Sequence, residues 1–471
     1  MCRQFLLTLL LIAAILPVSA GPRDVDIIVR GDHVLTMDDG LSLIENGAVA
    51  VRDSRIVAVG PWQQIRQDFA AAEMLAGKNR IVMPGLINGH THSGMTLFRG
   101  MIDDLGLQSW LKDYVFPMEG RFVDPEFIRI GSELACWEMI QGGTTTFVDM
   151  YFYPEEIAGV VERCGLRAII NAPHIDFPSP GFKGWDDSFA AAVAFVEAWQ
   201  ERHPRITPGF APHAPYTVSP EHIALTAQVA RKMNAPISIH LAEDPSEVNF
   251  IWDNYETTPI QHVAATGLFK ARVIGAHMVQ LDEKDIALVA AADSVGPIHN
   301  PTSNMKLGAG VSPVAAMIDA GISVGLGTDG AASNNDLDMW EEIRLAALLH
   351  KLKAADPTAV PAPVALAMAT RMGAVAVGLD DSVGQLVAGK QADLIQVDYS
   401  RLRQQPLYDV QSHLVYVLDS QDVVTTMVAG KVLMREREVL SIDGDALRKK
   451  VQRKRDEIRA ALAKTQASTA P

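Results

Sequence analysis

The sequence predicts an α/β protein, a (β/α)8 barrel of the TIM type with a small β-sandwich domain built from both ends of the chain. Eight apolar strand-like runs alternate with helical patterns through the middle of the chain. Short β-type runs broken by Gly and Asp stand before and after that middle. The length of 471 residues also fits one large barrel plus something smaller better than one simple domain.

The middle of the chain, residues 81–383, is expected to form the barrel. Its eight strand candidates are Ile81–Ile87, Thr145–Asp149, Arg167–Ile170, Ile206–Phe210, Ile237–Leu241, Val273–His277, Ser294–His299 and Ile322–Gly327. Helical patterns lie between them, including Pro125–Met139, Pro220–Met233 and Glu283–Ala292. A doubly wound open sheet would give a similar local pattern. The count of eight and the positions of the reactive residues favour the barrel.

Residues 21–80 and 384–440 are expected to pair into the small domain, because both carry short antiparallel-type strands. These strands are Asp26–Val29, Ala48–Val51, Ile56–Val59, Ala392–Val397 and Val423–Val428. Residues 441–471 form a C-terminal helix and tail. Their basic residues follow a helical pattern, which predicts a solvated helix rather than a binding patch.

The composition excludes several classes of protein. Hydrophobic residues make up 48% of the chain, which is too many for a disordered protein. Three Cys are too few for a disulfide scaffold. The net charge is −15, from 41 Lys and Arg against 56 Asp and Glu, which argues against a nucleic-acid polymer as partner.

Residues 1–20 predict a cleavable signal peptide and hence export to the periplasm or the medium. Arg3 is the one charge there, the run Phe5–Leu16 is apolar except for Thr8, and small residues end the segment. The run is shorter than the roughly 20 residues that span a bilayer, so no stable membrane anchor is expected once the signal is removed. Cys136 and Cys164 are expected to be buried free thiols, although an exported protein also permits a disulfide.

Five polar residues stand at the carboxyl ends of predicted strands, where barrel enzymes carry their chemistry. His90 and His92 follow the first strand, and residues two apart in extended chain point the same way. His240 and His277 end the fifth and sixth strands, and Asp329 follows the eighth. Any one of them alone could be a satisfied polar residue of the core. Together they predict a convergent site.

Three His and one Asp suit one divalent metal ion, most simply Zn²⁺, with a position left for water. Such an ion lowers the pKa of its bound water from about 15.7 toward 7. The end of the fourth strand, residues 209–213, offers no Lys or Glu to bridge two ions, so the site is interpreted as mononuclear.

Two further side chains are candidates for the same site. Glu243 follows His240 by three residues, and a carboxyl group beside a metal can transfer protons. The alternative is an ordinary acidic residue at the start of a surface helix. His299 ends the seventh strand and would either line the site or serve the structure of its loop.

Several stretches resemble the amidohydrolase superfamily, and within it the 5′-methylthioadenosine/S-adenosylhomocysteine deaminases. The first resemblance is carried by residues 84–92 (PGLINGHTH), 240–243 (HLAE), 276–277 (AH) and 327–330 (GTDG). The second is carried by residues 95–100 (MTLFRG), 147–152 (FVDMYF), 211–216 (APHAPY) and 331–335 (AASNN). The resemblance extends from about residue 26 to 439 and implies a metal-dependent hydrolytic deaminase of a purine nucleoside.

The resemblance also implies a role for each matched residue. It makes His90, His92, His240 and Asp329 the metal ligands, and it places His277 beside the hydrolytic water. Glu243 would protonate the purine ring at N1, Glu119 would hold the ribose hydroxyls and His213 would contact the purine edge. Asp329 would act in catalysis and touch the substrate as well. Water would add at C6 of an adenine ring, and ammonia would leave.

One departure from the family bears on the substrate. Members that take S-adenosylhomocysteine hold its carboxylate with arginines, one of them shortly after the third strand, and residues 167–174 (RAIINAPH) carry no Arg at that place. Uncharged substrates such as methylthioadenosine or adenosine are therefore favoured. The alternatives are a deaminase of a guanine-like, pterin or triazine ring, which an exported enzyme could also meet, and a non-catalytic barrel that only binds. A homo-oligomer is possible.

Overall fold

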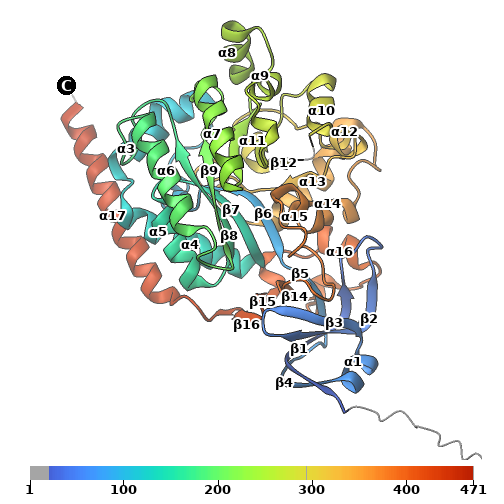
Figure 1. Cartoon of the computed structure of the whole chain (residues 1–471). Helices are drawn as coiled ribbons and strands as arrows, with labels where there is room; N and C mark the ends of the chain where they lie inside the picture. Colours follow the sequence, from blue (N-terminus) through green and yellow to red (C-terminus); the bar gives the residue numbers. More distant parts are fainter. Residues whose placement is uncertain (1–20, 293, 470–471) are drawn as a thin grey trace, which may run out of the picture.

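The computed structural model describes residues 21–292 and 294–469. They form a barrel surrounded by helices, with a smaller sheet domain at one end of it (Figure 1). The predicted signal peptide at residues 1–20 lies outside the described residues. Among the helices that the structure describes, none has the length and apolar character needed to cross a membrane.

Within the described chain, eight parallel strands form the barrel sheet and are hydrogen-bonded in sequence order. They are β6 (Leu86–Thr91), β7 (Thr144–Met150), β8 (Arg167–His174), β9 (Ile206–Pro212), β10 (Ile237–Leu241), β11 (Val273–His277), β12 (Val295–His299) and β13 (Gly325–Leu326). The amide of Asp329, just after β13, donates to the carbonyl of His90 in β6 at 3.0 Å and connects the last strand segment to the first. The predicted barrel is confirmed.

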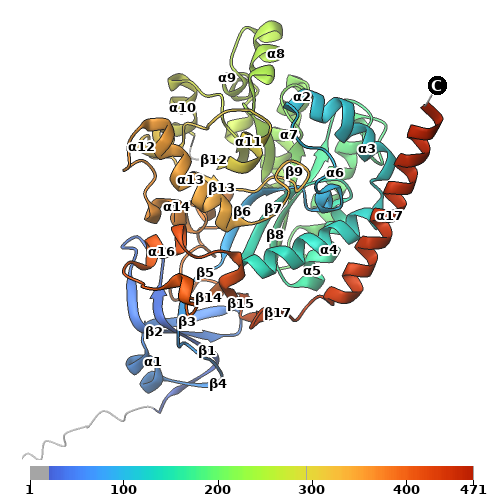
Figure 2. The same cartoon turned by 180° about the vertical axis from the view of Figure 1, so that it is seen from behind.

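Helices follow most of the strands and cover the outside of the barrel (Figures 1 and 2). They are α2 (Leu107–Ser109), α3 (Phe116–Phe122), α4 (Pro125–Gly142), α5 (Pro154–Cys164), α6 (Trp185–Trp199), α7 (Pro220–Met233), α8 (Pro245–Tyr255), α9 (Pro259–Ala265), α10 (Glu283–Ala290), α11 (Pro301–Lys306), α12 (Val314–Asp319), α13 (Met339–Ala354), α14 (Ala362–Met368), α15 (Arg371–Val377) and α16 (Val410–Tyr416). Many begin with Pro in the first turn, where a missing N–H costs nothing. The largest apolar core joins these helices to the strands, with Phe147 and Trp340 among its fully buried side chains.

The first predicted strand, Ile81–Ile87, is two strands in the structure. β5 (Arg80–Pro84) belongs to the sheet of the small domain, whereas β6 opens the barrel. Gly85 separates them, and a Cβ atom at this position would lie 2.1 Å from the side chain of Thr145. The missing side chain lets the chain pass from one sheet to the other within one residue. His90 therefore lies inside the first barrel strand rather than after it.

The last predicted strand, residues 322–327, is also shorter than expected. Only Gly325 and Leu326 pair with β12, and the chain then turns through Asp329, whose φ is +64°. Sequence periodicity predicts an apolar run here, but the backbone leaves the sheet early to present Asp329 to the site.

Both ends of the chain contribute to the small domain, as predicted. In the described residues its strands join in one nine-stranded sheet, in the order β17-β16-β15-β14-β5-β1-β2-β3, with β4 paired to β1. The bounds are β1 (Arg23–Leu35), β2 (Leu43–Arg52), β3 (Arg55–Pro61), β4 (Phe69–Leu75), β14 (Leu394–Asp398), β15 (Val423–Val428), β16 (Lys431–Arg435) and β17 (Glu438–Val439). Val49 and Val51 enter one apolar cluster, while Ala48 and Ala50 enter another on the opposite face. The second face is covered by a short helix, α1 (Trp62–Asp68), which the sequence pattern does not predict.

A buried ion pair links the small domain to the barrel. Arg167, at the start of β8, donates to both carboxylate oxygens of Asp393, at 2.9 and 3.2 Å. Both side chains are almost fully buried. The bidentate geometry fixes the orientation of the two units at this contact.

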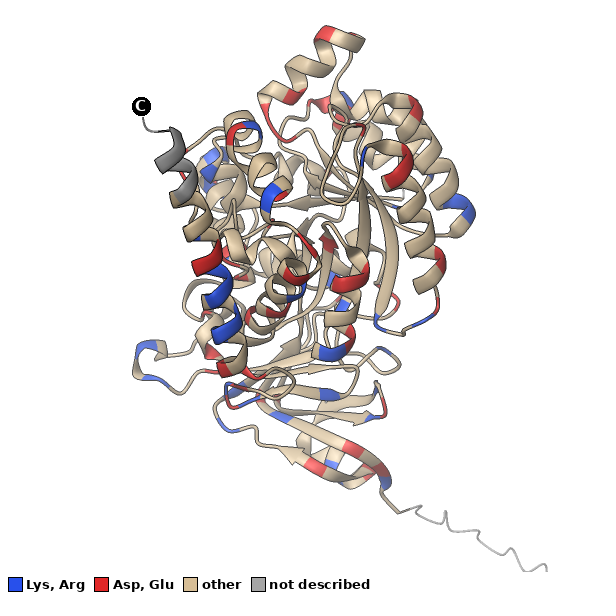
Figure 3. Ribbon diagram, turned by 90° about the vertical axis from the view of Figure 1, so that its left-hand side faces the viewer, with Lys and Arg blue, Asp and Glu red and all other residues tan. Residues whose placement is uncertain are grey.

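The C-terminal helix α17 (Gly444–Thr469) lies along α4 (Figure 2). Leu447 and Ile458 are buried against the main core. Lys454 is 8% exposed and donates to Glu126 of α4 at 2.8 Å. Charges of both signs follow the helix (Figure 3). Most of the helix is exposed to solvent, as predicted, but it also carries an apolar stripe that packs on the core, and it pairs several of its charges with α4.

The two cysteines that follow the predicted signal peptide lie on neighbouring helices. Cys136 of α4 and Cys164 of α5 are both buried and free, as the apolar pattern predicts.

Candidate active site

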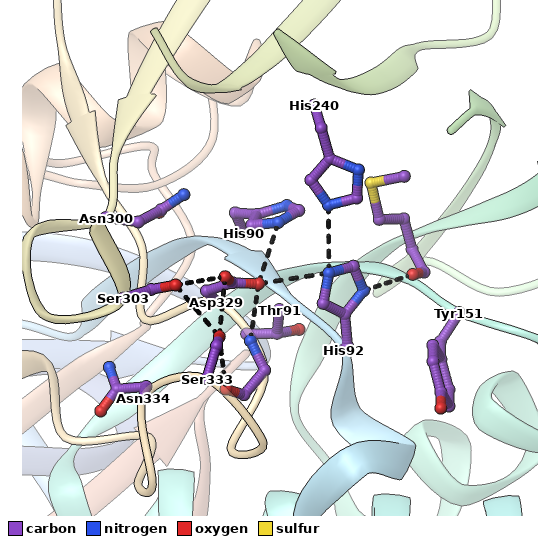
Figure 4. Close-up of polar contacts among 12 residues, drawn as sticks. His90, Thr91, His92, Tyr151, His240, Asn300, Ser303, Asp329, Ser333 and Asn334 are labelled. Carbon is purple, nitrogen blue, oxygen red and sulfur yellow. Dashed lines mark hydrogen bonds and ion pairs between the residues drawn. The ribbon is translucent and has the colours of Figure 1, made fainter. Parts of the chain in front are cut away.

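Four side chains converge at the carboxyl end of the barrel (Figure 4). His90 comes from β6, His92 follows that strand, His240 lies in β10 and Asp329 follows β13. One ligand atom of each lies within 4.8 Å of the others. These are the four residues that the sequence predicts as metal ligands.

Backbone carbonyls orient two of the imidazoles. His92 donates from Nδ1 to the carbonyl of Met150 at 2.7 Å, and His240 donates from Nδ1 to the carbonyl of His213 at 2.9 Å. The remaining nitrogens, Nε2 of His92 and Nε2 of His240, then face each other at 3.1 Å. Each ring carries its proton on Nδ1, so both Nε2 atoms have a free lone pair. Two lone pairs that face each other are favourable only when a cation binds between them.

His90 supplies the strongest test of a metal site. Its ring is fully buried, Nδ1 has no hydrogen-bond partner within the described chain, and Nε2 has only a long contact of 3.4 Å with Oδ1 of Asp329 (Figure 4). Burial lowers the pKa of His90 to about 4, so the ring is neutral at pH 7 and able to bind a metal. An unpartnered buried nitrogen is costly unless a ligand meets it. The donor set therefore fits a divalent ion.

Asp329 is held by a small hydrogen-bond network (Figure 4). Ser303 and Ser333 donate to Oδ2 at 2.7 and 2.9 Å, and the amide of Gly330 donates to Oδ1 at 2.7 Å. Oδ1 also lies 3.2 Å from Nε2 of His92. The serines thus turn the other carboxylate oxygen toward the histidines.

The strand ends that carry these groups have strained backbones. Ala242, His277, Met278 and Asp329 all have positive φ, between +44° and +74°. L-residues rarely adopt this conformation, and such strain is concentrated at functional sites. It aims the side chains of neighbouring strands at one point.

His277 is buried at the end of β11, beside the cluster. Its Nδ1 donates to Oδ1 of Asn304 at 2.9 Å, which leaves Nε2 free to accept a proton. Burial lowers the pKa of His277, so the ring is neutral at pH 7. Nε2 lies 3.8 Å from a carboxylate oxygen of Glu243.

Glu243 is a buried residue of the site, which rules against the surface-helix interpretation. It is 4% exposed and lines the cavity. Burial, together with the negative charges of Asp329 and Asp244, raises the pKa of Glu243 well above its usual range. Its backbone amide donates to Glu247 at 2.8 Å, which fixes the turn after β10. A protonated Glu243 can donate a proton to a bound substrate.

A cavity opens onto the cluster. Glu119 of α3 and His213 after β9 both line it. Glu119 is 5% exposed and accepts a hydrogen bond from Tyr151 at 2.8 Å. Burial raises the pKa of Glu119 to about 7, although the hydrogen bond from the Tyr151 hydroxyl opposes the rise. Burial also lowers the pKa of His213 to about 3.

The structure brings together every residue that the sequence analysis assigned to the site. They are Glu119, His213, Glu243, His277 and the four cluster residues. His299 is not among them, because its ring packs against His350 with centroids 5.0 Å apart and it does not line the cavity. Sequence reasoning missed Tyr151 and Asn304, which act through other side chains. No spacing pattern marks such contacts.

A barrel whose strand ends hold a buried His/His/His/Asp group defines a metal-binding hydrolase of the amidohydrolase class. The Amidohydrolase family matches residues 81–433, and the chain belongs to it. A bacterial imidazolonepropionase-like composite domain also matches residues 47–72.

Relatives of known name narrow the class. The chain is 43% identical over 430 residues to the 5-methylthioadenosine/S-adenosylhomocysteine deaminase of Pelotomaculum thermopropionicum, covering 91% of this chain and 98% of the relative. It is 41% identical to the 5′-deoxyadenosine deaminase of Methanosarcina mazei, covering 92% and 98%. An adenosine deaminase from Xanthomonas campestris, solved with bound zinc, superposes with a TM-score of 0.91 at 39% identity, covering 93% of this chain and 100% of that one. The protein is a hydrolase of carbon–nitrogen bonds, a deaminase.

Proposed function

We propose that the protein deaminates an adenine nucleoside to the corresponding inosine-type product and ammonia. The observation that carries this proposal is Glu119, a carboxyl group buried in the same cavity as Glu243 and the metal-binding cluster. A carboxylate accepts hydrogen bonds from both hydroxyls of a vicinal diol, and a ribose offers that diol. A free base offers this buried group no such diol.

The chain's own residues provide the proton transfers. Burial raises the pKa of Glu243 well above its usual range, so this group holds a proton more readily than an ordinary carboxyl group and can donate it to a ring nitrogen of the substrate. His277 presents an unprotonated Nε2 because Asn304 holds its other nitrogen, so it can accept a proton from the attacking water. The two groups lie 3.8 Å apart, so both face the same part of the cavity.

We propose Zn²⁺ as the ion of the cluster, since three imidazoles and one carboxylate are ligands that zinc prefers. When bound, the ion lowers the pKa of its water ligand toward 7 and so supplies the nucleophile at neutral pH. His90, His92, His240 and Asp329 would hold it.

The substrate is proposed to be uncharged at its 5′ end, as in 5′-methylthioadenosine, 5′-deoxyadenosine or adenosine. Among the described residues that line the cavity there is neither Lys nor Arg. The walls beside Glu119 are apolar and include Trp110, Val115 and Phe116. A homocysteine carboxylate would lose its hydration there without gaining a cationic partner.

An ammonia-release screen tests the function. Adenosine, 5′-methylthioadenosine and 5′-deoxyadenosine are expected to react, with kcat/KM for S-adenosylhomocysteine at least tenfold lower. Guanine, pterins and triazines probe the alternative of a free-base deaminase. Release of ammonia only from free bases would overturn the proposal. A protein that holds no metal and releases no ammonia from any of them would instead be a binding module.

We also propose that the protein is exported, on the strength of the charge and apolar run of residues 1–20. N-terminal sequencing of the protein from the extracytoplasmic fraction is expected to start at Gly21. Full-length protein confined to the cytoplasm would refute export.

A further inference from the structure

Two consecutive residues at the end of β7 hold different parts of the site. The carbonyl of Met150 accepts a hydrogen bond from His92 at 2.7 Å. The next residue, Tyr151, donates from its hydroxyl to Oε1 of Glu119 at 2.8 Å. The Tyr151 ring also lies beside the His92 ring, with centroids 5.8 Å apart (Figure 4). One short segment of backbone therefore holds both a residue of the metal cluster and Glu119 in place.

We propose that Tyr151 is a positioning residue that sets sugar recognition, because its hydroxyl holds the Glu119 carboxylate in the orientation that receives a vicinal diol. The inference rests on the proposed function, since it takes a nucleoside as the substrate. Tyr151 would be a second residue that contributes to recognition of the sugar. Because the same segment holds His92, it would also fix the distance between the sugar site at Glu119 and the metal cluster.

The hydrogen-bond inventory of Glu119 supports this role. In the described chain, the bond from Tyr151 is the one hydrogen bond that the Glu119 side chain accepts. A carboxylate has about four acceptor positions, so three remain after Tyr151 has used one. Two of them suffice for the two hydroxyls of a ribose. Without Tyr151, no hydrogen bond from the described chain would fix the orientation of this carboxylate.

Gly94 makes room for the Tyr151 ring. A Cβ atom at Gly94 would lie 2.8 Å from Cδ1 of Tyr151 and 2.7 Å from Cδ1 of Ile128. Real Cβ atoms do not approach a ring edge so closely, so a side chain at this position displaces Tyr151. The position therefore gives a second way to perturb the contact while the hydroxyl itself is kept.

The test compares Tyr151→Phe with wild type on two substrates, adenosine and 2′,3′-dideoxyadenosine, which lacks both hydroxyls. For adenosine we expect KM to rise about tenfold and kcat to change less than about twofold, since one hydrogen bond to a charged group is lost. For the dideoxy compound KM should stay within about twofold. Tyr153→Phe is the matched control, because it removes a hydroxyl two residues away and outside the cavity lining.

Gly94→Ala is expected to reproduce the same selective rise in KM for adenosine. In Glu119→Gln, adding Tyr151→Phe should change KM less than twofold, because the two residues act as one unit. An equal rise for both substrates, or no rise, in an active Tyr151→Phe enzyme would overturn the inference and leave the proposed function standing. A wild-type protein that deaminates no adenine nucleoside, including methylthioadenosine and 5′-deoxyadenosine, would refute the proposed function, and the inference with it.

Discussion

Replacing Glu119 by Gln should weaken catalysis and strengthen the fold at the same time. The ionised carboxylate is buried in an apolar part of the cavity, where burial raises its pKa from 4.5 to about 7. The folded protein therefore holds this proton more tightly than the unfolded chain does. The group adds stability below pH 4.5 in its neutral form, and that stability is lost as the pH rises through about 7.

The size of the effect follows from the pKa values. The rise from 4.5 to about 7 corresponds to about 3 kcal/mol of lost stability above pH 7, at about 1.4 kcal/mol per pH unit. A neutral Gln removes most of that cost at pH 8 and less than about 1 kcal/mol of it at pH 5. Loss of charge-assisted bonds to two hydroxyls, each worth about 1.5–3 kcal/mol, should lower kcat/KM for adenosine by at least about a hundredfold.

Thermal unfolding of both proteins at pH 5 and pH 8, together with steady-state deamination of adenosine, measures the two effects. Glu119→Gln should unfold several degrees higher than wild type at pH 8 and within about one to two degrees of it at pH 5. Free-base substrates should be unaffected. A variant that is less stable at pH 8, or one that keeps kcat/KM for adenosine within about threefold, would refute the reasoning.

Other perturbations test the remaining parts of the site and the fold. Asn304→Leu removes the acceptor of His277 Nδ1, so kcat should fall about ten- to a hundredfold with little change in KM, and a change confined to KM would contradict the positioning role. His90→Ala should reduce bound metal below about one tenth of an ion per chain by elemental analysis, and chelation of the wild type should abolish activity until a divalent ion is restored. Arg167→Met leaves Asp393 as an unpaired buried charge, so stability in urea should fall by about 3–5 kcal/mol, and a neutral outcome would show that the pair does not join the two units.

Much of the fold was predictable because it follows from periodicity. Helix α7, Pro220–Met233, and strand β10, Ile237–Leu241, have the bounds that the pattern predicts. The division of the first strand at Gly85 was not predictable, because a run of apolar residues has the same sequence pattern whether it lies in one sheet or passes from one sheet to another. The contact with Thr145 that requires the glycine is sixty residues away in the sequence and leaves no local signal.

The site shows the same contrast. His90 and His92 can be found from their spacing, because residues two apart in a strand share a face. Glu119 carries no local signal, and only the resemblance to a family pointed to it. Tyr151 and Asn304 were missed because their roles depend on the partner that each hydroxyl or amide meets in three dimensions.

The single-residue passage from β5 to β6 has a consequence for how the protein is made. β5 completes its pairing only with β14, so Pro84 and Leu394 must meet although almost the whole barrel separates them along the chain. Such a distant pairing is slow and comes late in folding. Strand β6, which carries His90, follows β5 directly. In a chain that ends before β14, β5 would lack this pairing, and the strand that carries the metal ligand would be less firmly held. We therefore expect a chain that lacks β14 to bind the ion more weakly than the full-length chain.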